Sequence, residues 1–245
     1  MCGGRGTRLD GDREKPLVPV AGRAMVDRVF DALAAAERVE TAYAAVSPHT
    51  PRTRERLVAR EGGEGSGPDA ESADKSGETS IVDTPGDGYV ADLRAALRAG
   101  PTAPTLTVAA DLPLLDGAAV DAVCDAHAAA DADALSVRVP AARKRELGAS
   151  ADAATRYGDS GADEGETPER VDLPAGINVV AALDDAGDEA VRTARDARLA
   201  VNVNRPADRR LAERILAGAA DAPDLPSGRV EWLDASASTE RGDPR

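Results

Sequence analysis

Aromatic side chains are scarce in this sequence, with one tryptophan, three tyrosines and one phenylalanine among 245 residues. A core must therefore be built mainly from Ala, Val, Leu and Ile, and the apolar fraction of 42% is sufficient for one. The two cysteines, Cys2 and Cys124, lie in no metal-binding spacing and are too few for a disulfide framework. No apolar run reaches the ~18 residues of a membrane span, and no secretory signal pattern opens the chain. We therefore expect a cytoplasmic protein without a membrane span.

Lysine is nearly absent as well. Lys15, Lys75 and Lys144 are the only lysines among 30 basic residues, so 27 are arginine, and 44 acidic residues bring the formal charge to −14. This balance argues against a nucleic-acid partner, which would require a basic stripe. The acidic residues are spread along the whole chain, which favours adaptation to molar salt, where the screening length falls to about 3 Å. An ordinary acidic soluble protein is the alternative.

Short apolar segments alternate with helical patterns. Strands are expected at 41–47, 105–110, 134–139 and 176–181, and helices at 25–36, 53–60, 89–99, 118–130 and 206–217. This alternation predicts an α/β fold, with a mostly parallel central sheet covered by helices. Residues 62–78 and 148–167 are rich in Gly, Ser, Asp and Glu and are expected to be mobile insertions of a domain spanning 1–221. Residues 222–245 are expected to be a polar, frayed tail.

Glycine and arginine gather at the start of the chain, in the run Gly3-Gly4-Arg5-Gly6-Thr7-Arg8. Glycines allow backbone N–H groups to approach a small anion closely, and Arg8 and Lys15 supply positive charge for phosphate oxygens. The run matches neither a Walker A loop nor the GxGxxG dinucleotide fingerprint. From these residues alone, a polyphosphate-binding loop and a flexible terminus with incidental charge are equally good interpretations.

Polar side chains also follow two of the expected strands. Asp111 comes directly after the segment 105–110, at the strand end where parallel sheets bind ligands, and a carboxylate there could hold Mg²⁺ with substrate phosphates. Capping of the turn before Pro113 is the alternative for Asp111. Asn202 and Asn204 alternate with valines, so both amides lie on one face of the segment.

The start of the chain resembles the opening motif of the nucleotidyltransferase superfamily, which has a Rossmann-like fold, in the stretch GGRGTRL…EKPLVPVAGRAMVDRV. The superfamily pattern of a glycine-rich loop, an arginine and a Lys-Pro pair falls on Gly3, Gly4, Gly6, Arg8, Lys15 and Pro16. The resemblance implies that the loop, including Arg5 and Thr7, binds a nucleoside triphosphate and that Arg8 and Lys15 are catalytic. It also implies a metal site at the Asp-x-Pro element of Asp111, completed by Asn202 first and Asn204 second.

The resemblance implies further contacts to the nucleotide. The segment Asp83–Leu93 matches the region that contacts the base and ribose, where backbone groups of Gly86 and Gly88 reach a purine edge and Asp92 accepts from guanine N–H groups. The alternative for Asp92 is a structural role in the first turn of the following helix. Gly176 and Asn178, in the segment PAGINVV, are assigned to the nucleotide site on the same basis.

Six motifs together most resemble the archaeal GTP:adenosylcobinamide-phosphate guanylyltransferases: GGRGTRL, VSPHTP, TPGDGYVADL, DLPLL, PAGINVV and VNVN. This implies transfer of GMP from GTP to adenosylcobinamide phosphate in coenzyme B12 synthesis, with Mg²⁺ as cofactor and pyrophosphate as by-product. Molybdenum-cofactor guanylyltransferase and sugar-phosphate nucleotidyltransferase are alternatives, as is a non-catalytic GTP-binding protein. No residue identifies the acceptor, and the oligomeric state is open, a homodimer included.

One feature departs from the superfamily pattern. An apolar strand precedes the glycine-rich loop in the superfamily, whereas only Met1 and Cys2 precede it here. A missing central strand would leave a gap of unpaired backbone groups. We expect either that the natural start lies upstream, with Met1 inside that strand, or that the sheet lacks it.

Overall fold

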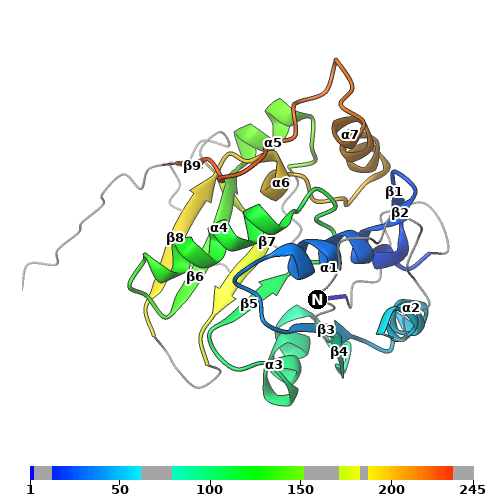
Figure 1. The fold of residues 1–245 in the computed structure, drawn as a ribbon, viewed down its shortest axis with the longest axis vertical. Helices are drawn as coiled ribbons and strands as arrows, with labels where there is room; N and C mark the ends of the chain where they lie inside the picture. Colours follow the sequence, from blue (N-terminus) through cyan, green and yellow to red (C-terminus); the bar gives the residue numbers. More distant parts are fainter. Residues whose placement is uncertain (3–12, 62–78, 152–170, 183–186, 234–245) are drawn as a thin grey trace, which may run out of the picture.

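The computed structural model describes residues 1–2, 13–61, 79–151, 171–182 and 187–233 (Figure 1). Its helices are α1 (Met25–Ala35), α2 (Pro51–Glu61), α3 (Tyr89–Ala99), α4 (Gly117–Ala128), α5 (Ala141–Leu147), α6 (Ala197–Ala200) and α7 (Pro206–Leu216), with a 3-10 turn η1 (Lys15–Leu17). Its strands are β1 (Pro19–Val20), β2 (Arg23–Ala24), β3 (Ala42–Val46), β4 (Thr79–Asp83), β5 (Thr105–Val108), β6 (Ala134–Pro140), β7 (Asp172–Val180), β8 (Glu189–Ala194) and β9 (Trp232–Leu233).

The strands form one five-stranded sheet and two sheets of two strands each. β3 and β4 pair in parallel, β1 and β2 pair antiparallel, and the remaining strands form a sheet of order β5-β7-β6-β8-β9. Within that sheet β5, β6 and β8 run in one direction, and β7 and β9 run in the other. Three of these five strands share one direction, and β3 and β4 pair in parallel, so the expected α/β fold with a mostly parallel central sheet is confirmed.

Helices cover both faces of the strands. Ala44 of β3 belongs to a buried cluster with Leu57 of α2, whereas the neighbouring Ala45 belongs to a cluster with Ala96 of α3. Because successive strand residues point to opposite faces, α2 and α3 lie on opposite sides of β3. The largest buried cluster lies on the five-stranded sheet, and its buried members among the described residues are Ala, Val, Leu, Ile and one Met. The core is thus built from aliphatic side chains, as the composition predicts.

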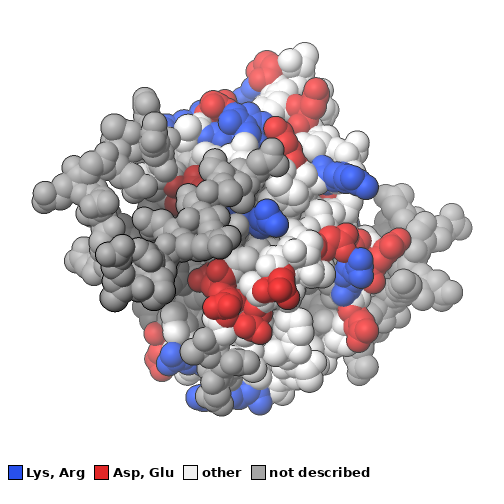
Figure 2. Space-filling model, turned by 90° about the vertical axis from the view of Figure 1, so that its left-hand side faces the viewer, with Lys and Arg blue, Asp and Glu red and all other residues white. Residues whose placement is uncertain are grey.

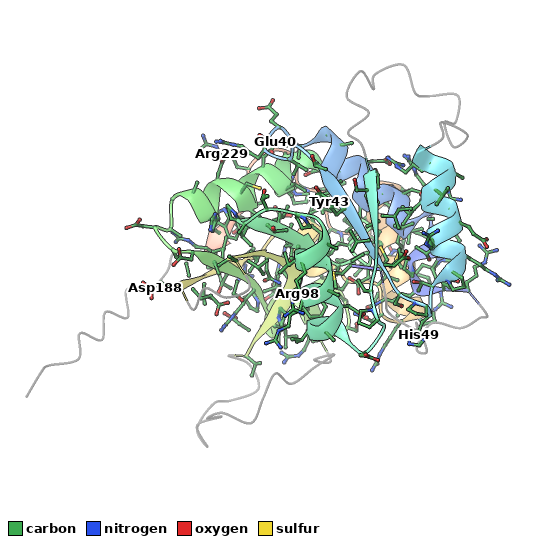
Figure 3. The ribbon with its side chains drawn as sticks, turned by 90° about the horizontal axis from the view of Figure 1, so that it is seen from below. Glu40, Tyr43, His49, Arg98, Asp188 and Arg229 are labelled. Carbon is green, nitrogen blue, oxygen red and sulfur yellow. The ribbon has the colours of Figure 1, made fainter. Side chains whose placement is uncertain are left out.

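Met1 and Cys2 lie between the two sheets. The Met1 ammonium donates to the carbonyl of Val108 at 2.8 Å, the amide of Ala110 donates to the Met1 carbonyl at 3.3 Å, and the Cys2 amide donates to the Ala45 carbonyl at 2.9 Å. Met1 therefore pairs with β5 in the manner of a parallel strand. A cavity of about 470 Å³ adjoins this contact, lined by side chains of α1, α3, β3 and β5, including Tyr43 (Figure 3).

Part of the expected polar tail is instead packed on the domain. Val230 is buried in the main core, and β9 pairs with β8. The guanidinium of Arg198, which is fully buried, donates to the carbonyl of Gly228 at 3.0 Å. These residues are therefore not frayed, because the apolar side chains of Val230 and Trp232 pack against the main core. Residues 234–245 lie outside the described part of the chain.

The second expected insertion also begins later than its composition suggests. Ala149 is buried in the main core, and the hydroxyl of Ser150 donates to the buried carboxylate of Asp208 at 2.8 Å. Residues 62–78 and 152–167, which make up the rest of the two expected insertions, are outside the described residues. Figure 2 shows one face of the molecule, where the described Lys and Arg side chains are interspersed with Asp and Glu and form no continuous basic stripe.

Candidate active site

Lys15 lies at the centre of a polar site formed by three distant parts of the chain. Its ammonium donates to Oδ2 of Asp111 at 2.5 Å and to Oδ1 of Asn204 at 2.7 Å. Lys15 is in η1, Asp111 follows β5, and Asn204 lies between α6 and α7. The Lys15 and Asp111 side chains are 19% and 16% exposed, so the pair is partly shielded from water but reachable from solvent. Two oxygen atoms, from Asp111 and Asn204, thus face one cation, and oxygen atoms in this arrangement also suit a hard divalent metal ion as ligands.

The residue before Lys15, Glu14, is bonded to the first turn of α2. The carboxylate of Glu14 accepts from the amides of Arg52 and Thr53 at 2.8 and 2.7 Å, and from the Thr53 hydroxyl at 2.6 Å. These amides belong to the first turn of α2, which has no partners for them within the helix. Glu14 therefore caps α2 from outside and fixes the backbone that carries Lys15. Sequence reasoning missed Glu14, because its partners lie 38 and 39 residues away.

The segment carrying the two asparagines is joined to Asp111 through the backbone. The amide of Val203 donates to the carbonyl of Asp111 at 2.9 Å, and Val203 is fully buried. The carboxylate of Asp208, also fully buried, accepts from the amides of Asn204 and Arg205 at 3.0 and 2.9 Å at the start of α7. Asn204 is thereby held on the side of the segment that faces Lys15.

Asn202 meets Asp111 through its nitrogen. Nδ2 of Asn202 donates to Oδ1 of Asp111 at 3.2 Å and to the carbonyl of Ala175 at 3.0 Å. Its Oδ1 accepts from the Nζ of Lys144 at 2.7 Å. An amide nitrogen cannot bind a cation, so in this arrangement Asn204, expected second for the metal role, contributes the oxygen beside that of Asp111. Asn202 instead supports Asp111.

Lys144 was not foreseen from the sequence. It lies on α5, is only 4% exposed, and also donates to the carbonyl of Ala200 at 2.8 Å. Burial lowers the pKa of Lys144 to about 8, although the nearby carboxylates of Asp111 and Asp208 act in the opposite direction. A lysine among charged residues of a helix usually faces solvent, so only the tertiary structure assigns it to the site.

A cavity of about 360 Å³ connects this site with the glycine loop after β4. Lys15, Asp111, Gly86, Gly88 and Asp92 all line it. Gly86 and Gly88 have φ of +80° and +113°, values that favour glycine, and Oδ1 of Asp92 accepts from the Gly86 amide at 2.7 Å. One Asp92 oxygen is therefore engaged inside the loop. The cavity thus brings expected phosphate-binding and base-binding residues together.

His49, on the turn between β3 and α2, lies against the same loop (Figure 3). Its Nε2 is 3.2 Å from the carbonyl oxygen of Gly86, and its side chain also lines the cavity. Tyr89, the first residue of α3, lines the cavity and is 43% exposed. Neither residue is among the site residues expected from the sequence.

Gly176 and Asn178 lie inside β7 and do not line this cavity. Gly176 has φ +87°, and a Cβ placed on it would come within 3.0 Å of Nδ2 of Asn202. Its absent side chain therefore leaves room for the Asn202 amide. Oδ1 of Asn178 accepts from the amide of Val137 at 3.1 Å, where the β6–β7 register shifts. Asn178 thus pairs with the neighbouring strand, a structural contact that its sequence position did not reveal.

Six of the expected site residues, Gly3, Gly4, Arg5, Gly6, Thr7 and Arg8, lie outside the described residues. Cys2, directly before the undescribed segment, and Lys15, three residues after it, both line the cavity. The described residues contain no cluster of three or more His, Cys, Asp or Glu side chains able to hold a metal. A divalent ion here would therefore use Asp111 with an amide oxygen and substrate phosphates, as Mg²⁺ commonly does.

The class of this protein is shown by its similarity to a known family. The chain matches the sequence profile of the MobA-like NTP transferase domain over residues 1–170, and it belongs to this family. No curated protein sequence matches the chain. In the described residues no helix is both long enough and apolar enough to cross a bilayer.

One solved structure shows the same fold at low sequence identity. The structure of CMP:2-keto-3-deoxy-manno-octonic acid synthetase complexed with CTP is 13% identical and superposes with a TM-score of 0.53, covering 86% of this chain and 95% of that one. A hypothetical transferase from Thermus thermophilus is 20% identical with a TM-score of 0.40, covering 70% of this chain. This chain spans 58% of the length of that transferase.

Proposed function

We propose that this nucleotidyltransferase moves GMP from GTP to adenosylcobinamide phosphate, giving adenosylcobinamide-GDP and pyrophosphate. Family membership supports the reaction class. The Lys15 ammonium between Asp111 and Asn204, in one cavity with the Gly86–Gly88 loop, carries the proposal for the site. The choice of guanine and of the cobinamide acceptor rests on the motif resemblance.

The transfer needs positioning more than acid–base chemistry. A phosphate oxygen of the acceptor forms a bond to the α-phosphorus of GTP, and the bond from that phosphorus to the bridging oxygen of pyrophosphate breaks. The attacking phosphate is already ionised at neutral pH, so no strong general base is required. This agrees with a chain that holds only two histidines. The protein must hold the phosphates in line and balance the negative charge of the transition state.

Lys15 is the residue we place on the triphosphate. Its flexible side chain reaches Asp111 and Asn204 and is 19% exposed at the cavity, so phosphate oxygens can replace either partner. The contacts of Glu14 with α2 fix the backbone next to Lys15, so the Lys15 ammonium stays at the cavity. Arg8, expected beside it, lies outside the described residues and keeps its proposed role on the departing pyrophosphate.

Asp111 and Asn204 are the residues that would hold Mg²⁺. Oδ2 of Asp111 and Oδ1 of Asn204 face the same cation, Lys15, which shows that two oxygens converge there. When bound, Mg²⁺ supplies charge neutralisation at the α-phosphate oxygens. Asp111 contributes a full negative charge for this role, and Asn204 contributes a neutral oxygen.

The Gly86–Gly88 loop is the proposed base contact. Because one Asp92 oxygen accepts from the Gly86 amide, that carboxylate shapes the loop as well as lying near the base. Backbone groups of the loop are then the direct means of recognising a purine edge.

The acceptor decides between this proposal and its alternatives. The full chain, with GTP and Mg²⁺, is given adenosylcobinamide phosphate, molybdopterin or glucose 1-phosphate, and pyrophosphate release is measured in low salt and in molar KCl. Circular dichroism establishes that the chain is folded in each buffer. Release with adenosylcobinamide phosphate alone supports the proposal. Release only with molybdopterin or the sugar phosphate rejects it, and GTP binding without release indicates a non-catalytic protein.

A further inference from the structure

Lys144 is a buried ammonium group in contact with the candidate site but not with its cavity. It lies on α5, is 4% exposed, and is absent from the residues that line the cavity. Its Nζ donates to Oδ1 of Asn202 at 2.7 Å and to the carbonyl of Ala200 at 2.8 Å. Burying an ammonium costs free energy unless its protons are satisfied, and these two acceptors satisfy it in part.

The side-chain amide of an asparagine accepts hydrogen bonds through Oδ1 and donates them through Nδ2. A partner that can bond only to Oδ1 therefore fixes the direction in which Nδ2 points. An ammonium has no acceptor capacity, and Lys144 can therefore face only Oδ1 of Asn202. Nδ2 is then turned towards Oδ1 of Asp111 and the carbonyl of Ala175. With Lys144 removed, Oδ1 of Asn202 loses its ammonium partner, and only the two acceptors of Nδ2 still hold the amide against Asp111.

Because of the orientation of Asn202, the two carboxylate oxygens of Asp111 have different partners. Oδ1 is held by Asn202, while Oδ2 faces Lys15 and the oxygen of Asn204. We propose that Lys144 is a positioning residue that acts through Asn202 and leaves Oδ2 of Asp111 as the oxygen that binds a divalent cation. The assignment of the cation rests on the proposed function, whereas the orientation of the amide does not.

Gly176 is the second part of this arrangement. A side chain on Gly176 would meet Nδ2 of Asn202 at 3.0 Å. The carbonyl of Gly176 accepts from the amide of Ala109, two residues before Asp111, at 2.7 Å. The amide therefore sits in a space bounded by β7 on one side and Lys144 on the other. Both boundaries are needed to hold it against Asp111.

Removing Lys144 changes the affinity for a divalent cation in opposite directions, depending on whether Lys144 positions Asp111 or acts only through its charge. Lys144 carries a positive charge near Asp111, so by electrostatics alone its removal would tighten binding of a divalent cation. If Lys144 positions Asp111, its removal weakens binding. The full chain without nucleotide is titrated with Mn²⁺ and followed by electron paramagnetic resonance. We expect Lys144→Met to raise the Kd about tenfold, and unchanged or tighter binding overturns the proposal.

Two variants control this measurement. Arg145→Met removes an exposed positive charge from the same helix and should leave the Mn²⁺ Kd within twofold. Asn202→Ala breaks the chain of contacts at its other end, and should weaken binding as much as Lys144→Met does. The double variant should be no weaker than either single variant, because both remove one interaction. Additive losses would show that Lys144 does not act through Asn202.

A second measurement is independent of metal binding and of the proposed function. Hydrogen exchange of the Asn202 side-chain amide is followed by NMR in the wild type, Lys144→Met and Arg145→Met. Both amide protons have acceptors, so exchange should be slow in the wild type and in Arg145→Met and at least tenfold faster in Lys144→Met. Equal exchange in all three overturns the proposal. If Asp111→Asn binds Mn²⁺ as the wild type does, the metal role fails while this result still decides the amide orientation.

Discussion

Lys15 and Asp111 are 96 residues apart in the sequence, yet Nζ of Lys15 lies 2.5 Å from Oδ2 of Asp111. The contact joins η1, which is fastened to α2 by Glu14, to the end of β5. The two side chains are 19% and 16% exposed, and both line the same cavity, so a ligand in that cavity can reach the pair.

Gly176→Ala tests the space reserved for Asn202. A left-handed φ costs about 1 kcal/mol for alanine, and at Gly176 the new Cβ also meets the Asn202 amide. Gly22 has a similar φ of +78° but nothing within 4 Å, so Gly22→Ala reports the backbone cost alone. We expect urea denaturation to show a loss for Gly176→Ala at least about 1 kcal/mol larger than for Gly22→Ala. Equal losses would contradict the close packing at Asn202.

Lys144 gives the protein a specific pH dependence. Burial lowers its pKa from 10.5 to about 8, so between these values the unfolded chain binds a proton that the folded chain has released. Stability from this group therefore rises with pH across that window, by roughly 3 kcal/mol in total. The stability of wild type relative to Lys144→Met, from urea denaturation at pH 7 and pH 10, should shift in favour of the wild type at the higher pH. A constant difference would show that Lys144 titrates as an exposed lysine does.

Glu14→Gln tests the anchoring of Lys15. The variant removes a charge that caps the first turn of α2, and we expect a loss of about 1 kcal/mol in thermal or urea unfolding. It should also raise KM for the nucleotide, because the backbone of Lys15 is no longer fixed. Glu55→Gln, an exposed change on the same helix, should alter neither quantity. An unchanged KM in Glu14→Gln would show that the contact of Glu14 with α2 does not affect nucleotide binding.

The main elements were predictable because their signals are local. The expected strands and helices all appear, since each carries a hydrophobic period that needs no partner to be recognised. β8 was missed because, apart from the buried Ala194, its residues are exposed or only partly buried, so it shows no apolar alternation. β9 is two residues long and depends on pairing with β8.

The site was predictable where residue type and chain position coincide. Lys15, Asp111, Gly86, Gly88 and Asp92 were expected from motifs, and the structure brings them to one cavity. The remaining contacts are set by tertiary packing. Nothing local distinguishes a buried lysine from an exposed one on α5, and nothing local tells which end of an asparagine amide faces a carboxylate.

Asp111 is the residue on which the whole account depends. Pyrophosphate release by the full chain is measured with GTP, Mg²⁺ and adenosylcobinamide phosphate for the wild type, Asp111→Asn and Asp125→Asn, the last removing a carboxylate from an exposed ion pair with Arg38. Losing one electrostatic stabiliser of the transition state should lower kcat of Asp111→Asn at least about 10²-fold, with Asp125→Asn within twofold of the wild type. An Asp111→Asn protein that turns over at the wild-type rate would contradict the account.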